Sequence, residues 1–304
     1  MVESGSASGV TRAAIVLTCY DAGDTLLETI ASIRNERAEL VIVDDGSTDE
    51  KTLAMLQGLE QEGFNVVHRP NGGLSAALMT GVEATTSPYI LRFDSDDLLE
   101  PGAVDDLAAA LDAHPRAAAA WGDLQTFGLT TSRVPSVPVL DPWHLTYASV
   151  LPASSMFRRA ALLDVGGWQL RGGYEDWDVW MALAEHGYTG VYVPRVVYRY
   201  RREHEGLLFD SLRRYEEHYE ELRRRHGLLF ARRAGNRQRS PAPRALKALL
   251  PVIDGLPRLA RLKKVWAAQL LTHLFWNGGL RTTLRMIVQA VSARVPPSRL
   301  SSRH

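Results

Sequence analysis

Apolar residues along the first hundred positions fall into two alternating patterns. Runs of mostly consecutive apolar residues predict buried strands, and they occupy residues 13–17, 40–43, 64–67 and 88–93. In the segments between these runs, apolar residues return every three or four positions, which predicts helices at 24–33, after 48, and at 74–84. Strand and helix therefore alternate four times, a pattern typical of an α/β protein with a mostly parallel sheet flanked by helices.

The same patterns continue less regularly toward the C-terminus. They predict strands at residues 117–121, 191–193 and 196–200, the last two on either side of Pro194, and helices at 104–113, 175–185 and 206–225. Residues 128–152 are rich in Thr, Ser, Pro and Val and predict an irregular segment. We divide the chain into an α/β domain of residues 1–230 and a basic, amphipathic helical tail of residues 231–304.

Charge is distributed unevenly along the chain, although the formal net charge is zero. Residues 207–304 contain 20 Lys and Arg against 6 Asp and Glu, which leaves the first 206 residues acidic. Within this basic part of the chain, the tail of residues 231–304 also carries an apolar stripe of Leu280, Leu284, Ile287 and Val291. We therefore expect the tail to contact an anionic membrane surface. Packing on the α/β domain or in a homo-oligomer is the alternative. Nucleic-acid binding is not expected, because no recognised module accompanies the charge.

The cysteine content and the N-terminal residues bear on the compartment. A single cysteine, Cys19, excludes an intramolecular disulfide and a cysteine-based zinc site, and it suits a reducing compartment. Residues 1–11 are small and polar and lack the apolar core of a signal peptide. We therefore expect a cytoplasmic protein, peripheral at the cytoplasmic face of the membrane if the tail binds lipid.

Three carboxylates follow the fourth predicted strand, and they belong to Asp94, Asp96 and Asp97. In open α/β sheets, ligands bind at the carboxyl ends of the strands. Clustered carboxylates repel one another unless a cation or a proton compensates them, and Mg²⁺ and Mn²⁺ prefer such oxygen ligands. The cluster therefore predicts a divalent metal that carries a phosphorylated ligand; the alternative is a solvated acidic turn that caps the next helix. Neither a Gly-x-Gly-x-x-Gly fingerprint nor a P-loop is present.

Four segments in register with the strand ends carry a family resemblance. They are Thr-Cys-Tyr-Asp at 18–21, Val-Asp-Asp-Gly-Ser-Thr-Asp at 43–49, Phe-Asp-Ser-Asp-Asp at 93–97, and Gly-Tyr-Glu-Asp-Trp-Asp at 173–178. Together they resemble the inverting nucleotide-sugar glycosyltransferases of the large family-two group, which have the GT-A fold, over about residues 12–206. The sequence departs from that family at Asp21, where Asn is usual, and at Leu78-Met79, where Arg-Asn is frequent.

The resemblance implies a nucleotide site at the ends of the first two strands. It assigns Thr18, Tyr20 and Asp45 to base recognition. An aromatic ring can stack on a base, and a carboxylate can accept the imino N–H of uracil or thymine, which favours a UDP- or dTDP-sugar and leaves a guanosine donor open. The alternative is that Asp44-Asp45-Gly46-Ser47 forms only a turn with a helix cap.

The resemblance also implies a metal and diphosphate site. Asp94 and Asp96 match the family's Asp-x-Asp motif, so Asp96 is expected to bind Mn²⁺ or Mg²⁺, and Asp94 to contact the ribose or assist the metal. His204 is a candidate third metal ligand, and Arg201 a candidate partner of the diphosphate. The alternative for His204 is a solvated side chain.

The catalytic base is implied at the start of the predicted helix 175–185. The family places it at the position of Asp176, with Glu175 in support, where one carboxylate takes the proton of the acceptor hydroxyl. The alternative is that both are helix N-terminal acids favoured by the helix dipole. Ser155, Trp168 and Tyr174 are candidate acceptor contacts, although tryptophans more often lie in a core.

These assignments predict a metal-dependent inverting glycosyltransferase of the hexosyltransferase type. It would move a sugar from a nucleoside-diphosphate sugar to an acceptor hydroxyl, in cell-envelope glycan, glycolipid or secondary-metabolite synthesis. A retaining transferase or a nucleotidyltransferase of the same fold is one alternative. A non-catalytic protein that binds a nucleotide sugar or a membrane surface is another.

Overall fold

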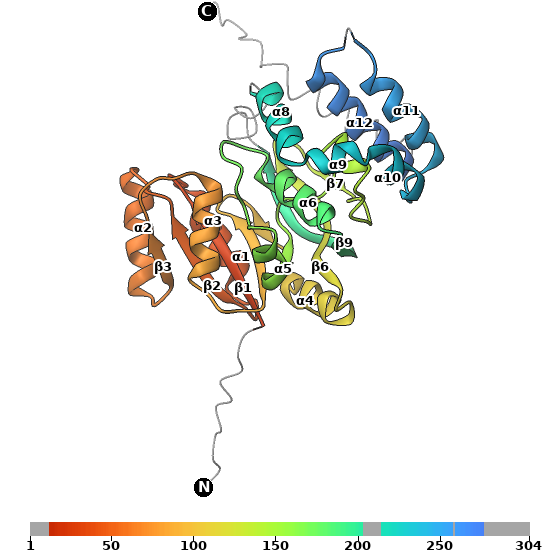
Figure 1. The fold of residues 1–304 in the computed structure, drawn as a ribbon. Helices are drawn as coiled ribbons and strands as arrows, with labels where there is room; N and C mark the ends of the chain where they lie inside the picture. The colour runs from red at the N-terminus through yellow and green to blue at the C-terminus, as the bar shows by residue number, and fades with distance from the viewer. Residues whose placement is uncertain (1–11, 203–213, 258, 277–304) are drawn as a thin grey trace, which may run out of the picture.

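Four parallel strands form the first half of the sheet. The computed structural model describes residues 12–202, 214–257 and 259–276. The strands are β1 (Ala13–Cys19), β2 (Glu39–Asp44), β3 (Asn65–His68) and β4 (Tyr89–Asp94), in the order β3-β2-β1-β4 (Figure 1). Each of the four predicted strands is confirmed.

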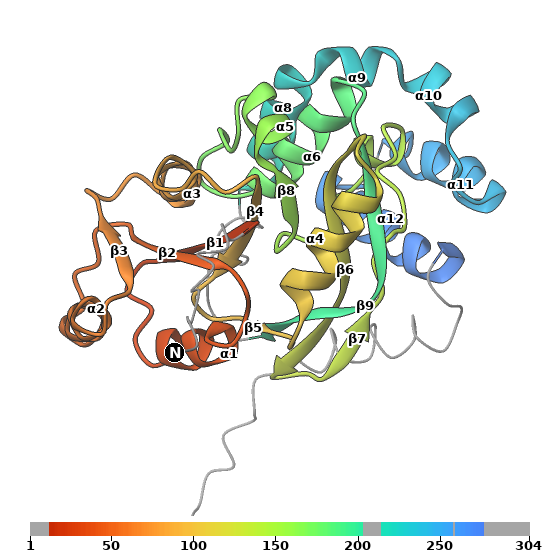
Figure 2. The same cartoon turned by 90° about the horizontal axis from the view of Figure 1, so that it is seen from below.

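Helices cover both faces of this half of the sheet. They are α1 (Thr25–Ile33), α2 (Glu50–Gln61), α3 (Leu74–Glu83) and α4 (Ala103–Ala113). Side chains of a strand alternate between the two faces. Val16 accordingly packs with the α3 side, whereas Ile15 and Leu17 pack with α1, α2 and α4 (Figure 2). Burial on both faces explains why the strands are continuous apolar runs.

The second half of the sheet is mixed. It contains β6 (Ala117–Gly128), β8 (Met156–Arg158), β9 (Thr189–Arg202), and the short edge strands β5 (Leu98–Leu99) and β7 (Ser132–Val134). Strand β8 runs antiparallel between β4 and β6, while β9 runs parallel to β6 and antiparallel to β5. The described sheet is therefore parallel at one end and mixed at the other.

One strand replaces the two strands predicted around Pro194. The pairing of β6 with β9 shifts register between Trp121, opposite Tyr192, and Asp123, opposite Val196. A proline has no N–H to donate, and such residues are tolerated in bulges. The strand therefore continues through Pro194 by forming a bulge. The sequence pattern had predicted an interruption at this proline, with two separate strands.

The remaining helices follow the sheet in sequence. They are the 3-10 turn His144–Thr146, α5 (Arg159–Asp164), α6 (Glu175–Glu185), α8 (Tyr215–Arg225), α9 (Gly227–Ala231), α10 (Arg233–Arg239), α11 (Arg244–Asp254) and α12 (Arg261–Trp276). Helix α6 has the predicted bounds, and α8 is the part of predicted helix 206–225 that the structure describes. The apolar stripe at residues 280–291 lies outside the described residues.

The C-terminal helices share the main hydrophobic core. Leu246, Leu250 and Val265 belong to the same buried cluster as the residues beneath α6. The His144 ring stacks on Trp276 at 5.3 Å between centroids, and its Nε2 lies 2.8 Å from the Thr272 hydroxyl. Residues 231–276 thus pack on the α/β domain as part of one body, and no separate core begins at residue 231. None of the described helices is both long and apolar enough to cross a membrane.

Candidate active site

The carboxyl ends of β1, β2 and β4 bring the predicted nucleotide contacts together. Thr18 lies opposite Val43 on one neighbouring strand and opposite Asp94 on the other. Thr18 is buried, whereas the Tyr20 side chain, one residue beyond β1, is 52% exposed and accessible to a ligand. The strand register therefore places Tyr20 and Asp94 on one edge of the sheet, as predicted.

Asp45 holds the loop that precedes α3. Its carboxylate accepts hydrogen bonds from the N–H groups of Gly72 (3.1 Å) and Gly73 (2.8 Å) and forms an ion pair with Arg69. Asp45 is itself buried. A base that reaches this carboxylate would therefore also meet the guanidinium of Arg69, a residue that the sequence analysis did not single out.

Backbone strain marks two positions of the predicted site. The non-glycine residues with a left-handed backbone in the described chain are Asp21 (φ 44°) and Tyr174 (φ 61°). Such conformations cost free energy and persist where surrounding contacts hold them. Asp21 is held because its Oδ1 accepts the N–H groups of Thr48 (2.7 Å) and Asp49 (2.9 Å), at the start of α2. These bonds lower the pKa of Asp21, and an Asn oxygen, usual in the family, could accept them equally well.

A buried arginine links the end of β4 to the start of α6. Arg92 is 3% exposed, and its Nη2 lies 3.0 Å from Glu175 Oε1 and 3.1 Å from Asp94 Oδ2. Its Nε and Nη1 are buried without a hydrogen-bond partner in the structure. A charge inside a protein needs compensation, and here two carboxylates supply it. The signal in the sequence was an arginine within an apolar strand, but its partner Glu175 is 83 residues away.

The three acids at the start of α6 have different surroundings. Glu175 is buried against Arg92, Asp176 is half-buried, and Asp178 is buried between Arg225 and His226. Burial raises the pKa of Glu175 to about 7, although Arg92 opposes the rise. Burial also raises the pKa of Asp176 from its ordinary value, again against the effect of Arg92. Asp176 is therefore the acid of the three that is partly exposed and forms no ion pair with the described residues. A raised pKa suits a general base at neutral pH.

The turn after β4 concentrates negative charge. Asp97 is buried, its Oδ1 accepts the Arg201 N–H at 2.9 Å, and its Oδ2 is buried without a partner. Burial, followed by the charges of Asp96 and Asp94, raises the pKa of Asp97 well above its ordinary value. Asp97 therefore does not cap the next helix, whose N-cap position is Gly102.

Asp94 and Asp96 fit a hard divalent cation. Both side chains are half-buried, and their negative charges help to raise the pKa of Asp97 in the same turn. Carboxylate oxygens are ligands that Mg²⁺ and Mn²⁺ prefer, and Mg²⁺ commonly uses one or two carboxylates together with substrate phosphates. The described residues contain no preformed group of three metal-binding side chains, and His204, the predicted third ligand, lies outside them.

Arg201 supports the acidic turn through contacts with protein groups. Its Nε donates to the main-chain oxygen of Asp96 at 2.8 Å, its Nη2 pairs with Glu28, and its guanidinium lies 4.4 Å from the ring centroid of Phe127. The assignment of Arg201 to a diphosphate stays a prediction. Its sequence position placed it near the site but could not show that Asp96 and Glu28 engage its Nε and Nη2.

The acceptor candidates divide between core and site. Ser155 is fully buried and donates to the Pro152 carbonyl at 2.9 Å, and Trp168 is buried against Phe157. Neither side chain has surface to offer an acceptor, which corrects both assignments. Tyr174, immediately before Glu175, is half-buried and lies 5.6 Å from the His218 ring. Tyr174 is therefore the acceptor candidate that remains at the site.

The fold and the site together define a glycosyltransferase of the GT-A type. The model of glycosyl transferase family 2 matches residues 14–147, and the model of glycosyl transferase family group 2 matches residues 146–296. This chain belongs to the family 2 glycosyltransferases.

Similar proteins agree with this assignment. The poly-beta-1,6-N-acetyl-D-glucosamine synthase of Staphylococcus aureus is 24% identical over 195 residues, which are 59% of this chain and 47% of that protein. The putative glycosyltransferase EpsH of Bacillus subtilis is 36% identical over 78 residues, 25% of this chain and 23% of that one. The chain thus spans about half the length, or less, of these curated relatives.

Two solved structures share the fold. One is S. aureus TarS 1-349 in complex with UDP-GlcNAc, with a TM-score of 0.59, 16% identity, and coverage of 93% of this chain and 79% of that one. The other is the mannosyltransferase PcManGT of Pyrobaculum calidifontis in complex with GDP-Man and Mn²⁺, with a TM-score of 0.53, 20% identity, and coverage of 94% and 81%.

Proposed function

We propose that this enzyme transfers a sugar from a nucleoside-diphosphate sugar to an acceptor hydroxyl, with inversion at the anomeric carbon. The arrangement of Arg92 carries the proposal. This arginine ties Asp94, at the nucleotide end of the site, to Glu175, next to the accessible Asp176. Through this arginine, the acid Asp94, which would bind the donor, and the candidate base Asp176 are held in one arrangement.

The chemistry assigns one role to each group. Asp176 accepts the proton of the acceptor hydroxyl as the hydroxyl oxygen attacks the anomeric carbon. Direct attack opposite the leaving diphosphate inverts the anomeric centre and needs one base rather than two carboxylates. Glu175 and Arg92 hold the start of α6 in place. Asp94 and Asp96 would hold Mg²⁺ or Mn²⁺, which supplies charge stabilisation to the leaving diphosphate when bound.

The neighbours support a nucleotide-sugar donor. The TarS structure holds UDP-GlcNAc, and the mannosyltransferase structure holds GDP-Man with Mn²⁺. The relative named as a poly-beta-1,6-N-acetyl-D-glucosamine synthase supports a glycan as acceptor. We also propose that the protein is cytoplasmic, and peripheral at the cytoplasmic face of the membrane if the tail binds lipid.

Product stereochemistry tests the proposal against its alternatives. The enzyme is incubated with a series of UDP- and dTDP-sugars, and the anomeric configuration of the product or of the released sugar is read by NMR. Inversion supports the proposal, and retention indicates a retaining transferase of the same fold. Formation of a nucleoside triphosphate and a sugar phosphate when pyrophosphate is added indicates a nucleotidyltransferase, and binding without turnover indicates a non-catalytic protein.

Donor binding is expected to require a divalent cation, and Asp96→Ala is expected to abolish the cation's effect. Asp96 supplies a carboxylate oxygen in the acidic turn. The measurement is calorimetric titration of UDP with Mn²⁺ or with excess chelator. The matched control is Asp105→Ala, an exposed acid on α4, which should behave like the wild type. Equal affinity of the wild type under both conditions would rule out the metal site.

The donor nucleotide is expected to be UDP or dTDP in preference to ADP. Adenine offers no imino N–H to the Asp45 carboxylate, whereas uracil and thymine do, and guanine does as well. Competition titrations with the four diphosphates measure this preference. Asp45→Asn, which replaces one acceptor oxygen by a donor, should reduce the preference. Tighter binding of ADP would place the base elsewhere.

A further inference from the structure

Helix α11 carries an apolar face that stays exposed. Leu249 and Val252 are spaced by three positions and are 38% and 61% exposed, and Leu256 continues the stripe just past the helix end. We call these three side chains the α11 face. Leu246 and Leu250, on the adjoining side of the helix, lie in the core. Both views of the fold place α11 at the periphery of the molecule (Figures 1 and 2).

Exposed apolar side chains gather in this part of the chain. Of eleven large hydrophobic residues that are exposed in the described structure, five lie between residues 249 and 275. They are the α11 face together with Trp266 and Phe275 of α12. Single exposed apolar residues are normal, but a local group of them marks an interaction site.

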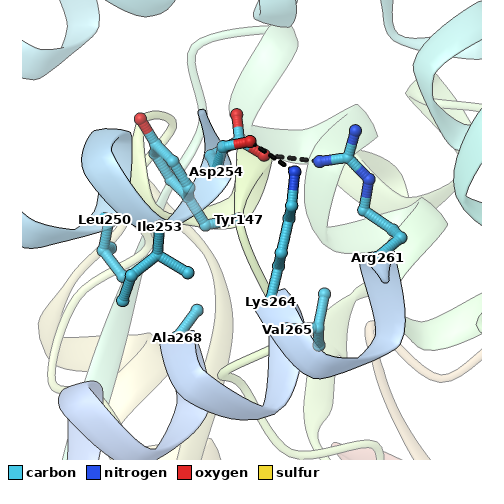
Figure 3. Close-up of a pocket in the computed structure, with 8 residues that line it drawn as sticks. All are labelled: Tyr147, Leu250, Ile253, Asp254, Arg261, Lys264, Val265 and Ala268. Carbon is cyan, nitrogen blue, oxygen red and sulfur yellow. Dashed lines mark hydrogen bonds and ion pairs between the residues drawn. The ribbon is translucent and has the colours of Figure 1, made fainter. Parts of the chain in front are cut away.

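The surroundings of the α11 face are positively charged. Residues 226–276 contain ten Lys and Arg and one acid, Asp254. Figure 3 shows Asp254 paired with Arg261 and bonded through its main-chain oxygen to the Lys264 amine. Asp254 also pairs with Arg233, outside this view. Between residues 226 and 276, four exposed basic side chains form neither an ion pair nor a side-chain hydrogen bond with the described residues, namely Arg232, Arg237, Arg244 and Lys263.

We propose that the α11 face and the basic side chains around it bind an anionic phospholipid surface. Apolar side chains of an interfacial helix enter the boundary between headgroups and acyl chains, while basic residues attract the anionic headgroups. Charge disfavours the other occupants. Two copies of the chain that met through this face would bring their basic side chains together. Residues 277–304 are disfavoured as the occupant for the same reason, because they carry five Arg and no acid. The proposal does not depend on the reaction that the enzyme catalyses.

The test measures partition of the full chain onto vesicles. Sedimentation with phosphatidylcholine vesicles, with or without phosphatidylglycerol, gives the bound fraction. Leu249→Gln/Val252→Gln should bind the anionic vesicles about tenfold more weakly, because two apolar side chains no longer enter the boundary. The control, Leu27→Gln/Leu53→Gln, removes two leucines of similar exposure from α1 and α2 and should bind like the wild type.

A charge variant tests the electrostatic part independently. Arg244→Gln/Lys263→Gln should bind anionic vesicles about fivefold more weakly for each basic side chain removed. The difference in vesicle affinity from the wild type should vanish at high salt. Arg37→Gln/Arg116→Gln removes two exposed arginines from the opposite half of the chain and serves as its control. Circular dichroism melts establish that each variant is folded.

Three results would overturn the proposal. The first is a wild type that does not bind anionic vesicles. The second is binding that neither the apolar nor the charge variant weakens beyond its control. The third is a dimer, seen in analytical ultracentrifugation, that the Leu249→Gln/Val252→Gln variant loses while vesicle binding is unchanged, since a second copy would then cover this face.

Discussion

Asp176→Asn is expected to lower kcat by ~10²–10⁴-fold and to leave donor affinity nearly unchanged. Asparagine keeps the size and shape of the side chain but cannot take the proton of the acceptor hydroxyl. Loss of turnover without loss of binding marks an interaction made in the transition state. Steady-state kinetics with a UDP-sugar and calorimetry with UDP measure the two quantities separately.

The neighbouring acids supply matched controls for this substitution. Asp178→Asn removes charge from a carboxylate held between Arg225 and His226, so it should lower stability more than kcat. Glu175→Gln keeps an oxygen that can accept from Arg92 and should reduce kcat less than Asp176→Asn does. If Glu175→Gln is inactive while Asp176→Asn turns over normally, the base is Glu175. Full activity of both variants would favour a retaining or substrate-assisted route.

The pH profile provides a second readout of Asp176. Burial raises its pKa, although Arg92 opposes the effect, so the base should become protonated at a higher pH than an ordinary aspartate. The wild-type kcat should therefore fall as the pH is lowered through this raised pKa. The residual activity of Asp176→Asn should lack that acidic limb. An unchanged limb in the variant would mean that another group controls it.

The sequence was sufficient to predict the elements that carry the site. Continuous apolar runs are unambiguous when both faces of a strand are buried, which is the situation of Ile15 and Val16 in β1. Asp49 caps α2, since its side chain accepts the N–H of Thr52, three residues later. Such signals are local, so the carboxyl ends of the strands, and the acids on them, could be placed in advance.

Side-chain partners distant in sequence could not be predicted in the same way. Arg201 and Trp168 stand at the positions expected of site residues, yet Glu28 engages the first and Phe157 covers the second. The extension of β6 to Gly128 was also missed, because the segment after Trp121 is not apolar and forms a strand only through its pairing with β9. The tail likewise gave no local sign that Thr272 would meet His144.

At a pH above 7, where Glu175 is ionised, Arg92→Met is expected to lower the free energy of unfolding by ~3–5 kcal/mol, the cost of leaving a buried charge without its partner. The charge left behind is that of Glu175, 3.0 Å from the arginine and buried. Urea denaturation measures the change. The control is Arg214→Met, which breaks an exposed, solvent-screened pair with Glu217 and should leave the free energy of unfolding nearly unchanged.

A double variant separates stability from function. Arg92→Met/Glu175→Leu replaces both charged partners by apolar side chains, an exchange that is often nearly neutral for a buried pair. It should therefore recover most of the lost stability. Transfer activity should stay low, because the start of α6 and Asp94 are no longer tied to each other. A double variant as active as the wild type would show that the Arg92 bridge has no part in positioning Asp176.

The penalty of Arg92→Met should also depend on pH. The pKa of Glu175 is raised to about 7 in the folded protein, against 4.5 for an ordinary glutamate. Between these values the folded state binds more protons than the unfolded state, so the contribution of Glu175 to stability falls as the pH rises. Without Arg92, a protonated Glu175 is tolerated and an ionised one is not. The stability gap between variant and wild type should therefore be small near pH 4.5 and largest above pH 7. A gap of constant size across this range would mean that Arg92 contributes through packing rather than through the charge of Glu175.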